Sequence, residues 1–293
     1  MDDIVLNFNK SSVTLINVTL AFIMFGIALD LSIEKFKQVL TTPKKLVAGL
    51  ISQLLLLPLF TFLLISIFKP LPSVALGMIL VASCPGGNIS NFISSLAKAN
   101  VELSISLTSV TSILAIIFTP LNFNFYGSLY EPSQAILQEI SLDWLEVVQT
   151  IATIIIIPII IGMLVRSKLP VIAKKLSKPL ELISMLLFLL IVIGALTSNL
   201  NYFMECVAAV FSLVLLHNTG ALSIGYLSGS LLGLDFKDKK SLAIETGIQN
   251  SGLGLLIIFS FFNGLGGMAI VTAWWGIWHI VSGFTIAYLW RKR

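Results

Sequence analysis

The sequence predicts an all-α polytopic membrane protein with nine transmembrane helices, two of them interrupted near their centres. Apolar residues make up 57% of the 293 residues and charged residues only 11%, and the mean hydropathy is +0.99. A soluble domain carries about 25% charged residues. Nine stretches reach the roughly 20 mostly apolar residues that a membrane-spanning helix needs. Glycine and polar side chains interrupt two of these stretches, at 85–91 and 245–252.

Four spans are predicted in the first part of the chain. The span at 12–30 precedes a lysine-containing segment, and the span at 46–68 follows two lysines and contains a proline that neighbouring helices can accommodate. The span at 73–97 carries the sequence CPGGNISN in its middle, and the span at 101–120 is rich in Ser and Thr and ends at a proline. Residues 121–146 lack Lys and Arg and are predicted to form a loop.

Five spans follow this loop. They cover residues 147–165, 181–200, 205–232, 241–263 and 268–290. The fourth of them carries the interruption ETGIQNSG. Because an interrupted span is the penultimate one of each part, we expect two inverted repeats within a single domain 1–293, namely 12–120 with four helices and 147–290 with five.

The basic residues predict the orientation in the membrane. In this arrangement 16 of the 18 Lys and Arg lie on one side, and only Lys10 and Lys69 lie opposite. The positive-inside rule then predicts a multi-pass protein of the plasma (inner) membrane, with its N-terminus outside and its C-terminus in the cytoplasm. The N-terminal sequence MDDIVLNFNK is acidic where a signal peptide would be basic. The expected partner is the lipid bilayer, and no nucleic acid is expected.

Glu245 is the only acidic residue that these spans place deep in the membrane. A carboxylate at the bilayer centre costs between about 2.5 and 17 kcal/mol unless it is paired, and no Lys or Arg lies deep in a predicted span. Its partner is therefore a proton or a metal cation, or it is a protonated acid bonded to a neighbouring helix. Thr246, Gln249 and Asn250 lie beside it, and hard cations prefer such oxygen ligands.

The first interruption supplies further oxygen atoms. Asn88, Ser90 and Asn91 follow two glycines, and in the next span Ser104 and Thr108 lie four residues apart and share one helix face. Ser and Thr in membrane helices often bond only their own i−4 carbonyl. As a set facing a lone acid, these residues are interpreted as cation ligands.

Other polar residues within spans are more ambiguous. Gln53 stands alone in an apolar run, where an interhelical hydrogen bond and a direct function are equally open. His217 and His279 lack the Cys or His company of a zinc site and are interpreted as packing residues unless other observations intervene. Cys84 and Cys206 are too few for a disulfide framework.

At these motifs the chain resembles the bile acid:sodium symporter family. The motifs are CPGGNISN at 84–91, LSISLTSV at 103–110, LLHN at 215–218, ETGIQNSG at 245–252 and IWH at 277–279. The resemblance covers nearly the whole chain and implies the nine-span form of the family fold. It implies a core domain at 46–120 and 205–290 and a panel domain at 12–30 and 147–200, with the two interrupted spans crossing at their unwound centres.

The resemblance also implies two sodium sites behind this crossing. The residues of the first site would be Ser90, Asn91, Ser104, Thr108 and Glu245. Those of the second would be Gln53, Glu245, Gln249 and the carbonyls of Thr246 and Ile248. Because Glu245 would belong to both sites, two cations would account for its lack of a basic partner.

We therefore expect a sodium-coupled symporter that imports a small organic anion, either bile-acid-like or another carboxylate or sulfonate, by alternating access. The backbone amides of Asn88, Ile89 and Ser90 open a half-helix, whose N-terminus favours an anion. Asn250 and His279 are the candidate second contacts. The family resemblance puts Asn88 where bacterial members often carry Thr, beside the expected substrate crevice.

Two alternatives stay open at this point. A proton-coupled organic anion carrier would cycle a proton on Glu245, and a metalloid (arsenite) efflux carrier would use Cys84 as a thiolate. An enzyme would need a nucleophile–base pair or a metal cluster, and the sequence offers neither, so no enzyme is expected.

Overall fold

The computed structural model describes residues 1–2, 10–30, 43–140, 144–197 and 200–291. The regular structure within these ranges is helical. The helices of the first part are α1 (Lys10–Asp30), α3 (Pro43–Ile51), the π-helical η1 (Ser52–Leu56), α4 (Leu57–Phe68), α5 (Pro72–Ser83), α6 (Ile89–Leu96), α7 (Val101–Leu129), the 3-10 helix η2 (Glu131–Ser133) and α8 (Gln134–Ile140). Those of the second part are α9 (Trp144–Lys168), α10 (Pro170–Thr197), α11 (Leu200–Leu231), α12 (Phe236–Gly247), α13 (Ser251–Phe261) and α14 (Gly266–Arg291).

Many of these helices have the length and composition of membrane spans. The five stretches long and apolar enough to cross a bilayer, within the described ranges, are Pro43–Phe68, Val101–Leu129, Leu145–Lys168, Val210–Leu231 and Gly266–Arg291. Shorter apolar helices are Asn17–Gly26, Pro72–Ser83 and Ser251–Phe261. A helix, or a pair of helices separated by a break, lies at each predicted span. The fold is that of a polytopic membrane protein, while the number of nine crossings stays a prediction.

Two pairs of helices are separated by short breaks that contact each other. One break lies between α5 and α6, and the other between α12 and α13. The Gly87 amide donates to the Ile248 carbonyl at 2.8 Å, and the Asn250 amide donates to the Pro85 carbonyl at 2.8 Å. An unpaired backbone group in the hydrocarbon region would cost several kcal/mol. The two breaks therefore satisfy part of each other's backbone as a minimal antiparallel pair.

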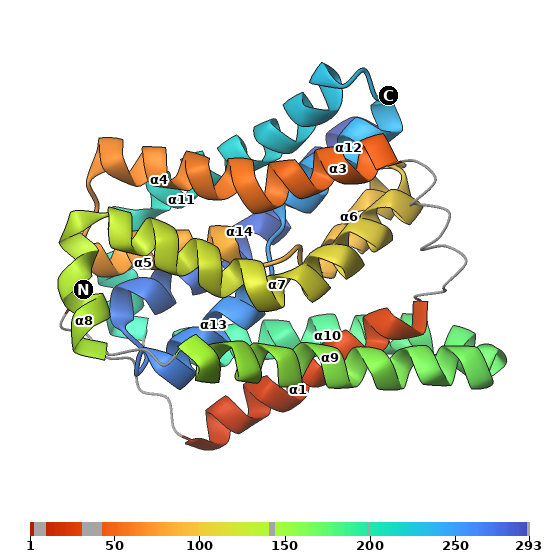
Figure 1. The fold of residues 1–293 in the computed structure, drawn as a ribbon, viewed down its shortest axis with the longest axis horizontal. Helices are drawn as coiled ribbons and strands as arrows, with labels where there is room; N and C mark the ends of the chain where they lie inside the picture. Colours follow the sequence, from red (N-terminus) through yellow and green to blue (C-terminus); the bar gives the residue numbers. More distant parts are fainter. Residues whose placement is uncertain (3–9, 31–42, 141–143, 198–199, 292–293) are drawn as a thin grey trace.

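Three helices form a layer of their own. Helix α1 packs against α9 and α10, which also contact each other. Figure 1 shows these three helices side by side along one side of the molecule, beneath the larger helical body that contains both breaks. We call α1, α9 and α10 the three-helix layer.

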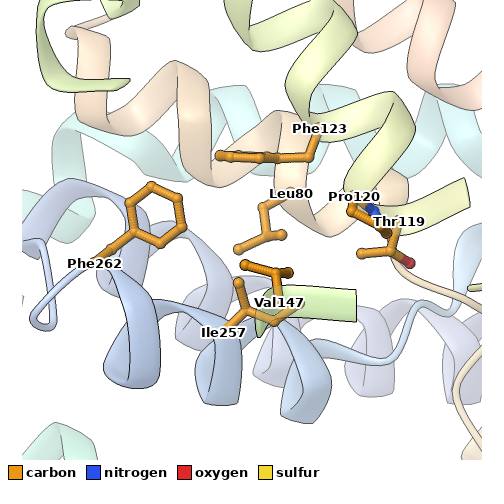
Figure 2. Close-up of a pocket in the computed structure, with 7 residues that line it drawn as sticks. All are labelled: Leu80, Thr119, Pro120, Phe123, Val147, Ile257 and Phe262. Atoms are coloured by element: carbon orange, nitrogen blue, oxygen red, sulfur yellow. The ribbon is translucent and has the colours of Figure 1, made fainter. Parts of the chain in front are cut away.

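An apolar pocket marks the boundary between this layer and the larger body. Figure 2 shows Leu80 of α5 and Phe123 of α7 facing Ile257 of α13 and Val147 of α9. Thr119, Pro120 and Phe262 complete the lining. Since α9 supplies one wall and the larger body supplies the rest, the pocket lies between the two groups of helices.

The predicted loop at 121–146 is wrong for most of its length. Helix α7 continues through Pro120 to Leu129, and η2 and α8 follow it. A proline removes one backbone hydrogen bond and strains the preceding turn. In a helix of 29 residues the remaining hydrogen bonds carry the backbone past that defect.

Pro58 has a visible compensation. Its missing N–H would have bonded the Leu54 carbonyl four residues earlier, and the side-chain amide of Asn122 in α7 donates to that carbonyl at 2.9 Å. The π-helical η1 lies just before this proline and contains Gln53. Such π-helical turns are frequently found at functional sites.

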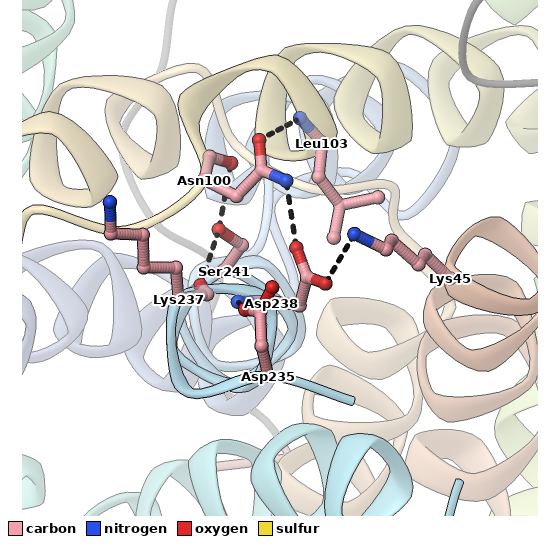
Figure 3. A network of polar contacts seen from close by, with 7 residues as sticks. All are labelled: Lys45, Asn100, Leu103, Asp235, Lys237, Asp238 and Ser241. Atoms are coloured by element: carbon pink, nitrogen blue, oxygen red, sulfur yellow. Dashed lines mark hydrogen bonds and ion pairs between the residues drawn. The ribbon is translucent and has the colours of Figure 1, made fainter. Parts of the chain in front are cut away.

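A polar network joins α3, α7 and α12 at the end of the molecule where lysines gather. Asp238, which is 1% exposed, pairs with the Lys45 ammonium at 2.6 Å and accepts from the Asn100 side chain at 2.7 Å. Ser241 donates to the Asn100 carbonyl at 2.7 Å, and Asp235 accepts from the Asp238 amide at 2.8 Å. Figure 3 shows Lys45 and Asn100 converging on the Asp238 carboxylate from two different helices.

The same end contains other basic residues used to predict the orientation. Lys240 donates to the carbonyls of Ala97 and Trp290, both at 3.0 Å, near the C-terminal ends of α6 and α14. Cations are favourable at such ends because of the helix dipole. The predicted basic residues that lie outside the described ranges are Lys35, Lys37, Lys292 and Arg293.

Replacing Lys45 by Met should destabilise the protein, because it leaves the buried Asp238 carboxylate with only amide and solvent partners. We expect a loss of about 1–3 kcal/mol, since the lysine is partly exposed and the pair is not fully desolvated. Thermal unfolding of the detergent-solubilised protein measures this, with Lys44→Met as the exposed neighbouring control. Equal melting temperatures for the two variants would show that the network contributes nothing.

Candidate functional site

Glu245 lies in the last turn of α12, directly before the second break, and its side chain is completely buried. Ser90 comes from the first turn of α6, and Ser104 and Thr108 come from successive turns of α7. These three hydroxyl-bearing residues are also buried, each with no exposed surface. Helices from both parts of the chain thus meet at one carboxylate.

Three hydroxyl groups donate to the Glu245 carboxylate. The Ser90 and Ser104 hydroxyls lie 2.7 and 2.9 Å from Oε2, and the Thr108 hydroxyl lies 2.5 Å from Oε1. Charge-assisted hydrogen bonds of this kind are about twice as strong as neutral ones. They stabilise a carboxylate in the interior, but they supply no positive charge.

The cluster of Glu245 and these three hydroxyls has more acceptor lone pairs than hydrogen-bond donors. The Thr108 hydroxyl also lies within bonding distance of the Asn91 side-chain oxygen, at 3.3 Å, and of the Ser104 carbonyl, at 3.0 Å. A hydroxyl has one hydrogen and two lone pairs, so it can serve only one of these acceptors. An oxygen-only set with a surplus of acceptors suits a hard cation. Throughout the described ranges no group of three His, Cys, Asp or Glu could hold a metal ion.

Gly86 explains how the first break approaches the carboxylate. A Cβ atom at this position would collide with Oε1 of Glu245 and lie 3.1 Å from the Gln53 amide nitrogen. Any side chain here would displace either the carboxylate or Gln53. The two glycines of the first break are therefore required for close approach of the backbone.

A second group of polar residues connects η1 to the second break. The Gln53 amide nitrogen is 3.4 Å from Oε1 of Gln249, and the Gln249 amide nitrogen donates to the Thr246 carbonyl at 2.8 Å. Oε1 of Gln53 is buried without a partner. The Ile248 carbonyl accepts the Gly87 amide but keeps a second lone pair. The residues predicted for a second sodium site are thus neighbours.

The predicted substrate contacts are only partly brought together. Asn88 is the N-cap of α6 but makes no side-chain cap, and its Oδ1 atom is buried without a partner. Ile89 follows it and is half-buried. Asn250 caps α13 by accepting from the Leu253 amide at 3.0 Å. His279 is 2% exposed, and no hydrogen bond joins its ring to Asn88 or Asn250 among the described contacts.

Two polar residues support the breaks without having been predicted as site residues. The Asn218 side chain donates to the Gly247 carbonyl at 2.7 Å, at the end of α12. The Ser52 hydroxyl lies 2.8 Å from that of Thr246. Asn218 follows His217 and Ser52 precedes Gln53, two polar residues singled out from the sequence. For Ser52 that adjacency is the only sequence signal, whereas Asn218 also ends the motif LLHN at 215–218.

His217 and Cys84 are packed in the interior, away from the Glu245 hydroxyl contacts. The His217 Nε2 atom lies 2.6 Å from the Thr61 hydroxyl, and its ring packs against Trp275 with centroids 4.7 Å apart. Cys84 is 1% exposed and belongs to the main hydrophobic core. Reactive thiolates occupy electropositive, partly exposed positions. The buried, apolar surroundings of Cys84 are not those of the thiolate that the metalloid alternative requires.

Comparison with known proteins identifies the family. A model of the Sodium Bile acid symporter family matches residues 17–206. The chain belongs to this family. Its members' names identify them as transporters and not as enzymes.

The similarity to known relatives covers most of this chain. It is 33% identical to the sodium-dependent transporter YocS of Bacillus subtilis over 95% of this chain and 83% of that protein. It is 29% identical to the probable sodium/metabolite cotransporter BASS1 of Arabidopsis thaliana, over 94% of this chain and 66% of that protein. With the human ileal sodium/bile acid cotransporter it shares 28% identity over 84% of this chain and 69% of that protein. Sodium as the coupling ion is common to these names.

Replacing Glu245 by Ala should abolish sodium-dependent binding, because it removes the only buried carboxylate of the cluster. The measurement is the thermal stabilisation of purified protein by NaCl relative to choline chloride. Glu102→Ala, which removes an exposed acid at the start of α7, is the matched control. Sodium-dependent stabilisation that survives in the Glu245 variant would remove this residue from the site.

Gln53→Ala should weaken sodium binding and leave direct contacts to the anion intact. Loss of one oxygen ligand to a charged group corresponds to a roughly 10- to 100-fold higher sodium concentration for half-maximal stabilisation. Gln134→Ala removes an exposed glutamine of α8 and should leave the titration unchanged. An unaltered sodium titration for the Gln53 variant would contradict the second cation site.

Proposed function

We propose that this protein is a sodium-coupled symporter that imports a small organic anion by alternating access, with two sodium ions per substrate. The observation that carries the proposal is the buried Glu245 carboxylate, which is surrounded by hydroxyl oxygens from α6 and α7 and closely approached by Gly86 of the first break. Membership of a sodium-dependent transporter family supports sodium as the cation.

The two cation sites share Glu245. Ser90, Asn91, Ser104 and Thr108 surround one side of the carboxylate. Gln53, Gln249 and the carbonyls of Thr246 and Ile248, which contact one another or the first break, would offer neutral oxygens to the other ion. One carboxylate with many neutral ligands fits two monovalent ions better than a divalent ion, whose sites use several carboxylates.

The anion site would lie where two half-helices begin. Helices α6 and α13 both start at the paired breaks, at Ile89 and Ser251, whereas α5 and α12 end there. Helix N-termini favour anions and C-termini favour cations. The crossing therefore offers one side to sodium and another to a carboxylate or sulfonate, with Asn88, Ile89 and Ser90 nearest the anion and Asn250 and His279 as further contacts.

Sodium and anion are coupled through the breaks. Cations bound at Glu245 would fix Ser90 and Asn91, which belong to the same short helix α6 as the anion-binding amides. Each ligand then raises the affinity for the other, as linkage requires.

Alternating access would use the division into the three-helix layer and the larger helical body. The layer contains α1, α9 and α10 (Figure 1) and corresponds to the panel, 12–30 and 147–200. The larger body corresponds to the core, 46–120 and 205–290, and carries every proposed ligand. Relative movement of panel and core would expose the crossing to either side.

The orientation follows from the basic residues. Lys45 and Lys237 lie around Asp238 at one end of the core (Figure 3), and Lys240 lies at the same end. This end would face the cytoplasm, with the N-terminus outside, in the plasma (inner) membrane.

Two sodium ions provide sufficient free energy for accumulation. A tenfold gradient supplies about 1.4 kcal/mol for each ion, and one net charge adds about 2.3 kcal/mol per 100 mV. The sum of about 5 kcal/mol sustains an accumulation of several thousandfold.

A thermal-shift screen of organic anions tests the function directly. Bile acids, hydroxy acids and other carboxylates or sulfonates should stabilise the purified protein more in NaCl than in choline chloride. A hit should then enter proteoliposomes only with an inward sodium gradient. Uptake that responds to pH and not to sodium would favour the proton-coupled alternative and overturn the proposal.

Asn88→Thr should change the substrate profile and spare the cations, because Asn88 lies at the start of α6 and outside the hydroxyl cluster on Glu245. The order of stabilising anions in the screen should change, while half-maximal sodium should stay within about twofold. Asn124→Thr, at an exposed position of α7, is the control. An identical anion profile would remove Asn88 from the substrate site.

A further inference from the structure

Ser52 links the π-helical η1 to the last turn of α12. Its side chain is completely buried, and its hydroxyl lies 2.8 Å from the Thr246 hydroxyl and 2.9 Å from the Gly49 carbonyl. The next residue, Gln53, contacts Gln249. Two consecutive side chains of η1 therefore reach the same segment around the second break.

The direction of the hydrogen bond follows from counting hydrogens. The Ser52 hydroxyl donates its single hydrogen to the Gly49 carbonyl. The short contact between the two hydroxyls then requires the Thr246 hydroxyl to donate to Ser52. Ser52 thus fixes the side-chain rotamer of Thr246 from a neighbouring helix.

The Thr246 carbonyl is the group that this contact holds in place. It accepts the Gln249 side-chain amide at 2.8 Å, and in the proposed second site it would ligate sodium. A carbonyl oxygen has two lone pairs, so the Thr246 carbonyl can bind a cation beside the Gln249 amide. The Ser52–Thr246 contact joins two side-chain hydroxyls and can persist when the carbonyl binds the cation.

We propose that Ser52 is a positioning residue of the second sodium site, which anchors Thr246 so that its carbonyl keeps its place when sodium binds. This inference rests on the proposed sodium-coupled function. Ser52 touches no proposed ion ligand atom directly and acts through Thr246.

The inference predicts a specific set of variants. Ser52→Ala removes the acceptor, and Thr246→Val removes the donor while keeping the size of the side chain and the backbone carbonyl. Each should raise the sodium concentration for half-maximal stabilisation about three- to tenfold, as for the loss of one hydrogen bond. The double variant should show no further change, because both substitutions remove the same interaction.

Ser106→Ala is the matched control. Ser106 is 5% exposed and donates to the Glu102 carbonyl of its own helix α7. Its replacement deletes a buried serine hydroxyl of the same size away from the second break, and the sodium titration should stay within about twofold of the wild type.

The measurement is the melting temperature of the full-length protein in detergent across a NaCl series, with choline chloride holding the ionic strength constant. Anion affinity at saturating sodium should not change in Ser52→Ala or Ser106→Ala, which separates positioning from general loss of structure. Should Ser52→Ala not yield folded protein, the isosteric Thr246→Val carries the test.

Two results would overturn the inference in different ways. In the first, sodium stabilises the wild type, but the half-maximal sodium concentration is unchanged in the Ser52 and Thr246 variants, or their effects add in the double variant. That result removes the positioning role and leaves the proposed function intact. A wild type that sodium does not stabilise overturns the proposed function and this inference together.

Discussion

The arrangement of this molecule depends on one buried carboxylate that has no basic partner among the described contacts. Three hydroxyls donate to Glu245, yet hydrogen bonds from neutral groups would leave the full negative charge of an ionised carboxylate in the interior. Desolvating such a charge costs several kcal/mol even after relaxation. In the proposed function a monovalent cation compensates this charge, and the surplus of oxygen lone pairs around the carboxylate would provide its ligands. Folding of the site and ion binding would then be linked in one equilibrium.

The two paired breaks make this site possible. Helices can approach a buried carboxylate with their side chains alone, but here the backbone at Gly86 approaches it closely enough that a Cβ would not fit. The breaks satisfy each other's amides and carbonyls, and side chains of the surrounding helices satisfy others, as Asn218 does at the end of α12. The four helix ends that meet there give one crossing both a cation-favouring and an anion-favouring side. The proposed cation and anion sites would therefore share the same backbone, which would be the physical basis for coupling their binding.

The sequence predicted the interruptions and the acid at their centre because a few polar residues in long apolar runs are a strong signal. It predicted the oxygen-rich residues around Glu245, and the structure brings Ser90, Ser104 and Thr108 to that carboxylate. It did not predict that α7 continues through Pro120, because the local rule that prolines end helices ignores the stability of a long helix. The contact between Ser52 and Thr246 was also not predicted, because the two residues lie 194 positions apart and serines in such helices often bond their own backbone. Residue type and spacing thus identified the candidate ligands, while the contacts that hold them depend on how distant segments pack.

A high-resolution structure determined in NaCl and again in choline chloride tests the central claim most directly. The account predicts a density peak between the Glu245 carboxylate and the Ser90, Ser104 and Thr108 oxygens in sodium, which disappears in choline. The same density in both salts, or none in either with the carboxylate and its hydroxyls unchanged, would contradict neutralisation of this charge by sodium.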